Sequence, residues 1–376
     1  MKHLKNTLAF LLAATVSLAF ASSAGAAGES VTATTSISGM GGKLFKEKQV
    51  AARLNIHAEV TTPDTSPQVL PMKNVKVTFP AGMAIRPNNS KTPVCSDSKL
   101  SNTSNLSNPS GVVASCSRSV VGSGTAAIYL AKVNLPTALI TDPILIEDPI
   151  LVLFNAGYTG SGQPRIKIYG YSKTTNVGIL MNGTLKGSVL SMAVPVLSND
   201  SAVKYFDLNF PGGRLDREDI GVHVRGLDPN YVQARCASSP LKTNAVFDLG
   251  ERTYPAGTDV GQTTRVASPE TMQSCVGLAG HAKLKAKVVK KPRAVRNGGR
   301  GFFRVYVRNY GTATAKGVYL FAPSVKKKVG WIAPGVARTI GIRARVRGRK
   351  GHSRTIRFTV KGNGVSASAF ARVRVK

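Results

Sequence analysis

The last quarter of the chain lacks acidic residues altogether. Residues 281–376 contain 26 Lys and Arg but no Asp or Glu, whereas the preceding 280 residues contain all 18 acids and the other 25 basic residues. Of the formal charge of +33, the last 96 residues therefore carry +26. Such a break in composition is typical of a domain boundary, which we place between residues 280 and 281. The absence of Asp and Glu from residues 281–376 excludes a surface of mixed charge on this region and favours a negatively charged partner.

Motifs of known catalytic and metal sites are also absent. The chain contains no G-x-S-x-G nucleophile elbow, no phosphate-binding P-loop and no H-E-x-x-H zinc motif. The glycine-rich segment 157–162 lacks the spacing of a dinucleotide-binding loop and predicts a hairpin turn. His57 lies in an alternating segment, as an exposed strand residue would, and His223 follows a charged turn. The sequence therefore predicts no catalytic residue, no metal ligand and no cofactor.

Long apolar runs are few, and the clearest lies at the N-terminal end. Two lysines precede an apolar stretch, residues 7–21, and residues 24–26 match the A-x-A pattern that a signal peptidase accepts. Residues 19–21 are a second match to that pattern. The stretch is shorter than the ~20 residues that a membrane-spanning helix needs. Residues 1–26 are therefore predicted to be a signal peptide, with no transmembrane segment in the mature chain. We expect a secreted or cell-surface protein.

Cysteine is scarce, and its count agrees with export. The four cysteines are Cys95, Cys116, Cys236 and Cys275. An even number of cysteines in an exported chain predicts two disulfides, for which three pairings are possible. We favour Cys95–Cys116 and Cys236–Cys275, because each of these bridges closes one loop-rich region. A metal site would need C-x-x-C pairs or nearby histidines, which the sequence does not contain.

Residues 281–376 alternate between apolar and basic side chains. Successive side chains of a strand point to opposite faces, so such segments bury their apolar residues and turn Lys and Arg outward. Phe370 is an exception, because it falls on the basic side of its segment. Turn residues separate the segments and predict six or seven strands, as in an immunoglobulin-like β-sandwich. The alternating segments are 283–288, 303–308, 340–347, 356–361 and 369–376.

Part of this region resembles a known family. The run Phe303-x-Val305-x-Val307-x-Asn309-x-Gly311, followed by Ile332-x-Pro334-Gly335, is similar to bacterial extracellular Ig-like repeats of the cell-adhesion-related (CARDB) kind. The resemblance covers roughly the last quarter of the chain and implies a non-catalytic spacer or adhesion module. The matching positions are structural, so the resemblance implies no ligand-binding residues. In lacking acidic residues, this region differs from calcium-stabilised adhesion repeats.

Residues 27–280 also predict an all-β fold, either as one β-sandwich with long loops or as two smaller ones. Prolines between residues 63 and 87 exclude a long helix there. The apolar runs 144–146 and 150–154 predict buried strands, and the Ser-, Asn- and Pro-rich segment 91–117 predicts a loop. Further strands are predicted from the alternating segments 52–60, 75–79, 165–169 and 204–210.

This N-terminal region is similar to secreted actinobacterial proteins of no assigned function. The resemblance rests on Phe79-Pro80-x-Gly82, on Cys95 and Cys116, and on the segments 121–126, 154–155 and 194–195. It implies secretion and a β-rich fold, and it supplies no active-site residues.

The basic C-terminal region carries the candidate binding residues. Clustered Lys and Arg gain affinity for a polyanion by releasing its condensed counterions. We therefore predict adhesion to an anionic cell-wall polymer or an acidic polysaccharide. The alternative is a solvated surface on which Lys and Arg protect strand edges from aggregation. No candidate recognition helix accompanies the basic residues, so sequence-specific nucleic-acid binding is not expected. The predicted polyanion-binding residues are Lys283, Lys285, Lys287, Arg304, Arg308, Arg343, Arg345, Arg347, Arg357, Arg372 and Arg374.

Two classes of function remain open at this point. The first is a secreted, non-catalytic envelope- or matrix-associated protein that its basic domain holds to an anionic surface. The second is an exported carbohydrate-active enzyme or other hydrolase, with the basic domain as a targeting module. The second class needs an acid/base pair in a pocket of residues 27–280. Its candidate carboxylates are Glu59, Asp207, Asp216, Glu218 and Asp219.

Overall fold

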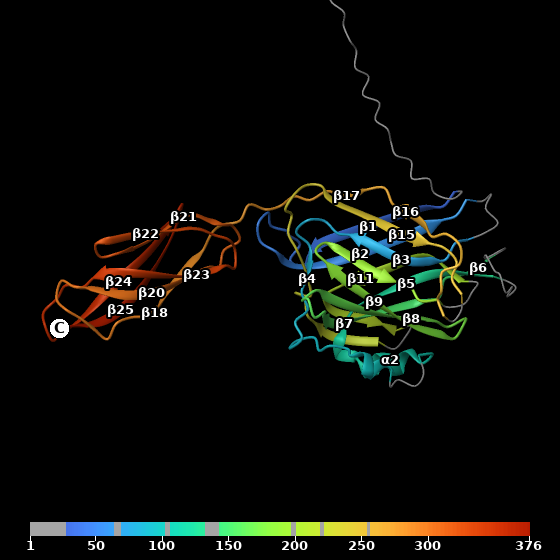
Figure 1. Cartoon of the computed structure of the whole chain (residues 1–376), viewed down its shortest axis with the longest axis horizontal. Coiled ribbons are helices and arrows are strands. Elements are labelled where there is room, and N and C mark those ends of the chain that lie inside the picture. Colours follow the sequence, from blue (N-terminus) through green and yellow to red (C-terminus); the bar gives the residue numbers. More distant parts are fainter. Residues whose placement is uncertain are drawn as a thin grey trace, which may run out of the picture.

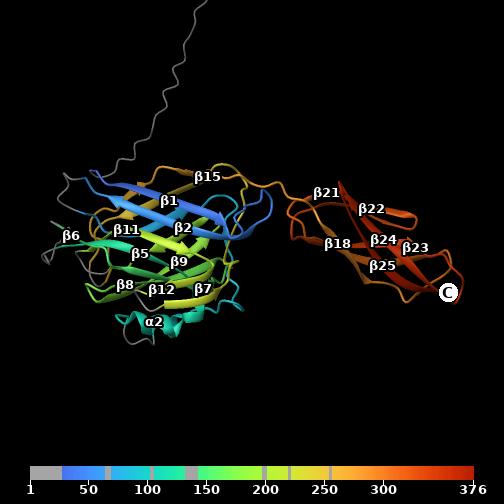
Figure 2. The same cartoon turned by 180° about the vertical axis from the view of Figure 1, so that it is seen from behind.

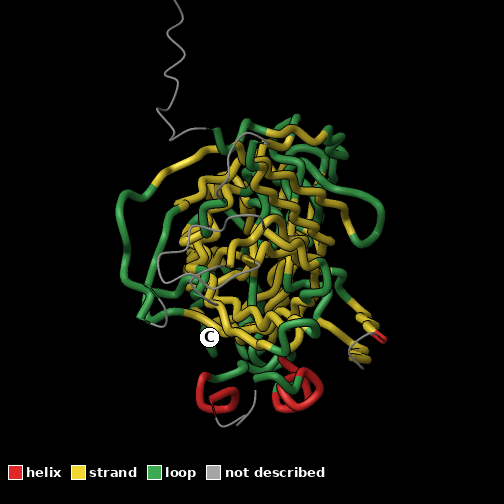
Figure 3. The backbone as a smooth tube through the Cα atoms, turned by 90° about the vertical axis from the view of Figure 1, so that its right-hand side faces the viewer, coloured by secondary structure: helices red, strands yellow, loops and turns green. Residues whose placement is uncertain are grey.

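The computed structural model describes residues 28–63, 69–101, 106–131, 143–196, 201–218, 222–253 and 256–376. The predicted signal peptide and Asp219 lie outside these ranges. The described chain is almost entirely β, as predicted, and forms two lobes that one connecting segment joins (Figures 1 and 2). Its α-helices, α1 (Asp97–Ser101) and α2 (Pro109–Ser115), contact each other and lie at one edge of the molecule (Figure 3). The 3-10 turn η1 (Ser117–Ser119) follows α2 in the chain.

One large sheet makes up most of the N-terminal lobe, by which we mean the described residues from 28 to 278. Its main path runs β16-β15-β3-β10-β9-β8-β7-β5-β11-β2-β14-β4, while β1 pairs with β2, β6 with β5 and β17 with β15. The strands are β1 (Ser30–Gly39), β2 (Val50–Thr61), β3 (Met72–Thr78), β4 (Ala84–Ile85), β5 (Val120–Ala131), β6 (Pro143–Ile146), β7 (Ile150–Tyr158), β8 (Pro164–Ser172), β9 (Val177–Lys186), β10 (Val189–Ala193), β11 (Ser201–Phe210), β14 (Val232–Ala234), β15 (Leu241–Leu249), β16 (Thr264–Ala267) and β17 (Thr271–Gln273).

This sheet curls until strands from its two ends meet. Thr35 on β1 and Thr243 on β15 share a hydrogen bond of 2.5 Å between their hydroxyls. The side chain of Gln273 bonds the backbone of Ile37 in both directions, accepting from its N–H at 2.8 Å and donating to its carbonyl at 2.9 Å. The curled sheet thus encloses the main hydrophobic core between its own layers.

The segment predicted as a loop, residues 91–117, contains short helices. Pro109 opens α2, and the side chain of Asn108 caps it by accepting a hydrogen bond from the N–H of Gly111. Val112 and Val113 bury their side chains against Phe154 of β7 and its neighbours. Burial of these two valines explains why a polar-looking segment becomes helical. Both favoured disulfides, Cys95–Cys116 and Cys236–Cys275, are present.

The two apolar runs of this lobe behave differently. Residues 150–154 lie buried in β7, as predicted. The prediction for residues 144–146 was wrong, because Ile144 and Leu145 of β6 keep 45% and 37% of their surface exposed. In the described residues β6 pairs with β5 alone, so no second strand covers it.

The C-terminal sandwich, residues 281–376, consists of two sheets with one shared core. The three-stranded sheet has the order β18-β20-β23 and the five-stranded sheet the order β19-β25-β24-β21-β22. Eight strands form where six or seven were predicted, in an immunoglobulin-like β-sandwich. They are β18 (Leu284–Lys290), β19 (Ala294–Val295), β20 (Arg300–Asn309), β21 (Ala315–Ala322), β22 (Val325–Ile332), β23 (Ala337–Arg345), β24 (Ser353–Gly362) and β25 (Val365–Val375).

As expected from the alternation, the apolar side chains of these strands are largely buried and the basic side chains largely face solvent. Phe303 and Phe358 come from opposite sheets, are fully buried and place their ring centroids 4.9 Å apart. Phe370 is 60% exposed on the basic side of β25. Trp331, the single tryptophan, lies on β22 and is 67% exposed. Among the described residues, no helix is both long and apolar enough to cross a membrane.

Candidate functional sites

The outer face of the three-stranded sheet gathers most of the predicted polyanion-binding residues. We call it the basic face. Its basic side chains alternate with buried apolar neighbours on each strand, which turns them toward solvent. Lys283 directly precedes β18 and Arg347 follows β23. Lys290 and Arg300, which sequence reasoning missed, belong to the same sheet. The predicted residues within it are Lys285, Lys287, Arg304, Arg308, Arg343 and Arg345.

Strand register places like charges directly opposite one another on the basic face. Lys285 pairs with Arg308, and after a bulge Lys290 pairs with Arg304. On the other side of β20, Arg300 pairs with Arg345. Opposed residues of antiparallel strands bring their Cβ atoms to about 5 Å, where like charges destabilise the sheet. A bound anion would remove this repulsion.

Aromatic side chains are interleaved with these cations. The Tyr310 ring centroid lies 5.2 Å from Nζ of Lys285 and 5.0 Å from Cζ of Arg308. Nζ of Lys287 lies 5.3 Å from the centroid of Tyr306. Such contacts orient cations while leaving their remaining N–H groups available. Phe302, 43% exposed on β20, adds an apolar surface beside Arg343.

Arg357, Arg372 and Arg374 lie elsewhere, on the outer face of the five-stranded sheet. Their register partners are neutral: Phe370 faces Arg357, Thr355 faces Arg372 and Ser353 faces Arg374. The predicted residues therefore divide between two opposite faces of the sandwich instead of forming one patch. The opposed like charges that mark the basic face are absent from these three positions.

The acidic residues of the N-terminal lobe neutralise few of the cations of the C-terminal sandwich. Every ion pair in the described part of the chain lies between residues 57 and 270. One acid reaches the C-terminal sandwich, because Glu47 accepts a hydrogen bond from the backbone N–H of Thr314 at 2.5 Å. Hydrogen bonds from the hydroxyl and the backbone N–H of Thr314, together with the positive charges of Lys316 and Arg235, lower the pKa of Glu47.

A polar hollow on the N-terminal lobe contains two of the candidate carboxylates. It measures about 660 Å³, and Asp207 and Asp216 both line it. Nδ1 of His57 lies 2.8 Å from Oδ1 of Asp207, and its Nε2 lies 3.7 Å from Oε2 of Glu59. Both ring nitrogens thus face carboxylates. A hydrolytic triad would instead place a nucleophilic hydroxyl at one of them.

Of the carboxylates near residue 216, Asp216 forms contacts with its own neighbours. Asp216 on β12 (Gly213–Arg217) pairs with Arg214 and lies 3.4 Å from His223 on β13 (Val222–Leu227). Burial would raise the pKa of Asp216, but the hydrogen bonds from Arg214 and His223 lower it overall, so this carboxyl stays ionised. Glu218 is exposed. Asp216 is therefore unsuited to act as a general acid.

Comparison with known proteins does not identify a family for the chain. No family model matches the sequence. No curated protein matches it either. A solved structure of Dscam1 isoform 8.4, comprising four N-terminal Ig domains, shares 12% identity over 91% of this chain and 73% of that one, with a TM-score of 0.17. The VesB protease of Vibrio cholerae shares 8% identity over 68% of this chain and 99% of that one, with a TM-score of 0.15. At such scores neither likeness supports a fold or a function.

Proposed function

We propose that this is a secreted, non-catalytic envelope- or matrix-associated protein whose C-terminal sandwich adheres to anionic surface polymers. The observation that carries the proposal is the register of the basic face, where Lys285 opposes Arg308 and Arg300 opposes Arg345. Uncompensated like-charge pairs cost stability, so a surface that only had to remain soluble would mix signs. The resemblance of residues 303–335 to CARDB-like adhesion repeats supports the same role.

The rows of basic side chains along the strands of the basic face suit an extended polymer. An anionic cell-wall polymer or an acidic polysaccharide presents charges along its length, and parallel rows of Lys and Arg can neutralise several at once. Each neutralised charge releases a condensed counterion, so affinity should fall steeply as salt rises. The sandwich has no helix to enter the major groove of a nucleic acid, so the proposed recognition is of charge and not of base sequence.

A charge-matched comparison on the full-length protein tests the proposal. The first variant carries Lys287→Gln, Arg304→Gln and Arg343→Gln on the basic face. The control carries Lys91→Gln, Lys173→Gln and Lys186→Gln, three exposed lysines of the N-terminal lobe. Both variants lose three positive charges, so they differ only in where the charge is removed. Binding to heparin, an acidic polysaccharide, is measured as the salt concentration that elutes each protein.

We expect the basic-face variant to elute at clearly lower salt than the wild type, and its logarithmic salt slope to fall by roughly three, about one per removed contact. The control should elute close to the wild type. Equal losses in the two variants would reduce the interaction to net charge and overturn the proposed site.

A further inference from the structure

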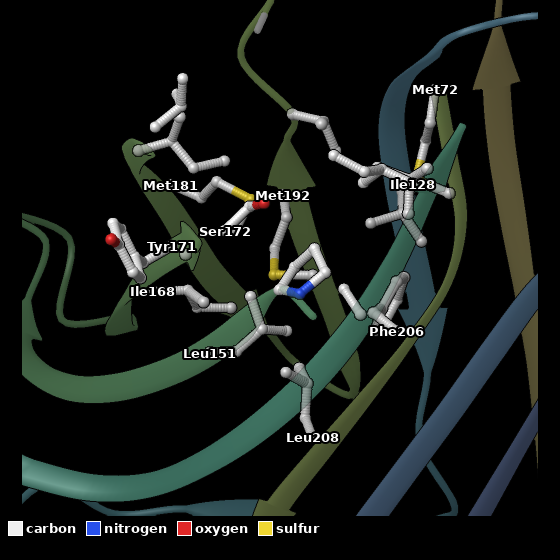
Figure 4. Close-up of a pocket in the computed structure, with 18 of the residues that line it drawn as sticks. Met72, Ile128, Leu151, Ile168, Tyr171, Ser172, Met181, Met192, Phe206 and Leu208 are labelled. Atoms are coloured by element: carbon white, nitrogen blue, oxygen red, sulfur yellow. The ribbon is translucent and has the colours of Figure 1, made fainter. Parts of the chain in front are cut away.

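The N-terminal lobe contains an apolar cavity that the basic face does not explain. It has a volume of about 370 Å³ and lies between the layers of the curled sheet. Figure 4 shows Met181 and Met192 projecting into it above Leu151, with Phe206 on the opposite wall. Hydrocarbon and thioether groups make up most of the lining. Interiors of proteins are normally close-packed, so a void of this size is a departure that calls for an occupant.

The cavity is elongated along the strands. Two strands each contribute three alternate residues, which span about 13 Å at ~3.3 Å per residue. Ala126, Ile128 and Leu130 come from β5, and Val177, Ile179 and Met181 from β9. Alternate residues of a strand share one face, so these side chains line the cavity over that length.

The volume matches a single chain of about a dozen carbons. A protein cavity of about 150 Å³ lined by apolar side chains stays dry and holds one benzene molecule. This cavity is more than twice as large. At about 30 Å³ for a group the size of a water molecule, it has room for roughly twelve such groups. It also falls within the range of ~300–1,000 Å³ that is typical of small-molecule sites.

Polar groups are concentrated at one end. Ser172 and Thr175 line the cavity at the turn between β8 and β9, next to Val177, which is 42% exposed. The Ser172 hydroxyl donates to Asp148 at 2.7 Å, so the polar end is held in place. Met72 and Ile168, which also line the cavity, are almost fully buried, with 2% of their surface exposed. The cavity therefore has a polar end beside an exposed turn residue and an apolar interior.

We propose that this cavity binds the hydrocarbon chain of a linear amphiphile, with the polar head left at the turn formed by residues 172–177. Methionine side chains are flexible and polarisable, so Met72, Met181 and Met192 can adapt to a chain that bends. A head group can lie against the polar side chains of this turn, and the apolar lining excludes a polar body from the interior.

A series of linear alcohols added to the full-length protein tests this site by calorimetry. From hexanol to dodecanol, the association constant should rise about fourfold per added methylene, as expected for burial of each group. It should then level off near dodecanol, where the cavity is full. A rise that continues through hexadecanol would indicate partition onto the surface and would overturn the proposal, as would the absence of binding across the series.

Variants that fill the cavity locate the binding. Ala126→Leu occupies the interior, and Val203→Trp blocks a half-buried position of the lining. Dodecanol should raise the Tm of the wild type by mass action, and both variants should lose at least nine-tenths of that increase. Val289→Trp, at a 49% exposed position of the C-terminal sandwich, is the matched control and should keep it. An equal Tm increase in all four proteins would place the alcohol elsewhere. Val203→Trp keeps the test valid if Ala126→Leu does not fold.

Discussion

Lys285 and Arg308 are register partners on β18 and β20, and both cations lie over the ring of Tyr310. The aromatic face is negative, so it attracts each cation while the two cations repel each other. The ring therefore offsets part of the repulsion that the register creates. A bound anion can offset the remaining repulsion between the two cations. The stability of this sheet is therefore linked to whether its surface is occupied.

Replacing Tyr310 should expose that repulsion. We expect Tyr310→Leu to lower the free energy of unfolding by about 1–2 kcal/mol at low ionic strength, since two cation–π contacts of ~0.5–1 kcal/mol each are lost. Added salt should recover part of this loss, because it screens the repulsion between Lys285 and Arg308. Thermal unfolding at two salt concentrations measures both effects. A loss that does not change with salt would contradict the electrostatic cause.

Removing one of two opposed arginines should stabilise the sheet. Arg300→Gln takes away the charge that faces Arg345. We expect its free energy of unfolding at low salt to rise by a few tenths of a kcal/mol, while its affinity for heparin falls. Lys361→Gln is the matched control, because the register partners of Lys361 on β21 and β25 are the uncharged Tyr319 and Ser366. Stabilisation of both variants, or of neither, would show that the register of charges is not the cause.

The ion pair between Asp97 and Lys167 predicts a pH dependence in the N-terminal lobe. Lys167 is almost fully buried, and its hydrogen bond and positive charge lower the pKa of Asp97. A carboxyl with a lowered pKa stabilises the fold at neutral pH, and this contribution is lost progressively as the pH falls from about 4 through the lowered pKa. Asp97→Asn should therefore lower the Tm by a few degrees at neutral pH and by much less at pH about 3.

Lys167→Met provides the control for this pair. It removes the buried charge along with the need for a partner, so its loss of Tm at neutral pH should be smaller than that of Asp97→Asn. Melting curves followed by circular dichroism measure the Tm of the wild type and of both variants at the two pH values. An effect of Asp97→Asn that persists unchanged in acid would rule out the ion pair as its origin.

Alternation along single strands could be predicted from the sequence, and pairing between strands could not. The alternation correctly predicted that Phe303 is buried and Arg304 exposed, because which face of a strand a side chain lies on depends only on its neighbours in the chain. The opposition of Arg300 to Arg345 depends on register between strands far apart in sequence. The same holds for His57 and Asp207, 150 positions apart.

The errors of prediction have similarly local causes. Residues 144–146 read as a buried strand from their apolarity, yet burial also needs a covering neighbour, which β6 does not have among the described residues. The helix α2 had a usable signal, since Asn108 followed by Pro109 is a typical N-cap and first helical residue. The apolar cavity had none, because a gap between side chains leaves no trace in their order along the chain.

Trp331 gives the molecule a built-in optical probe. It is the single tryptophan of the chain and lies exposed on β22, whereas seven of the ten tyrosines precede residue 281. Indole emission therefore comes from the C-terminal sandwich alone, and it reports on the surroundings of an exposed position on the outside of that unit. Excitation of indole alone thus observes this unit in the unlabelled full-length protein.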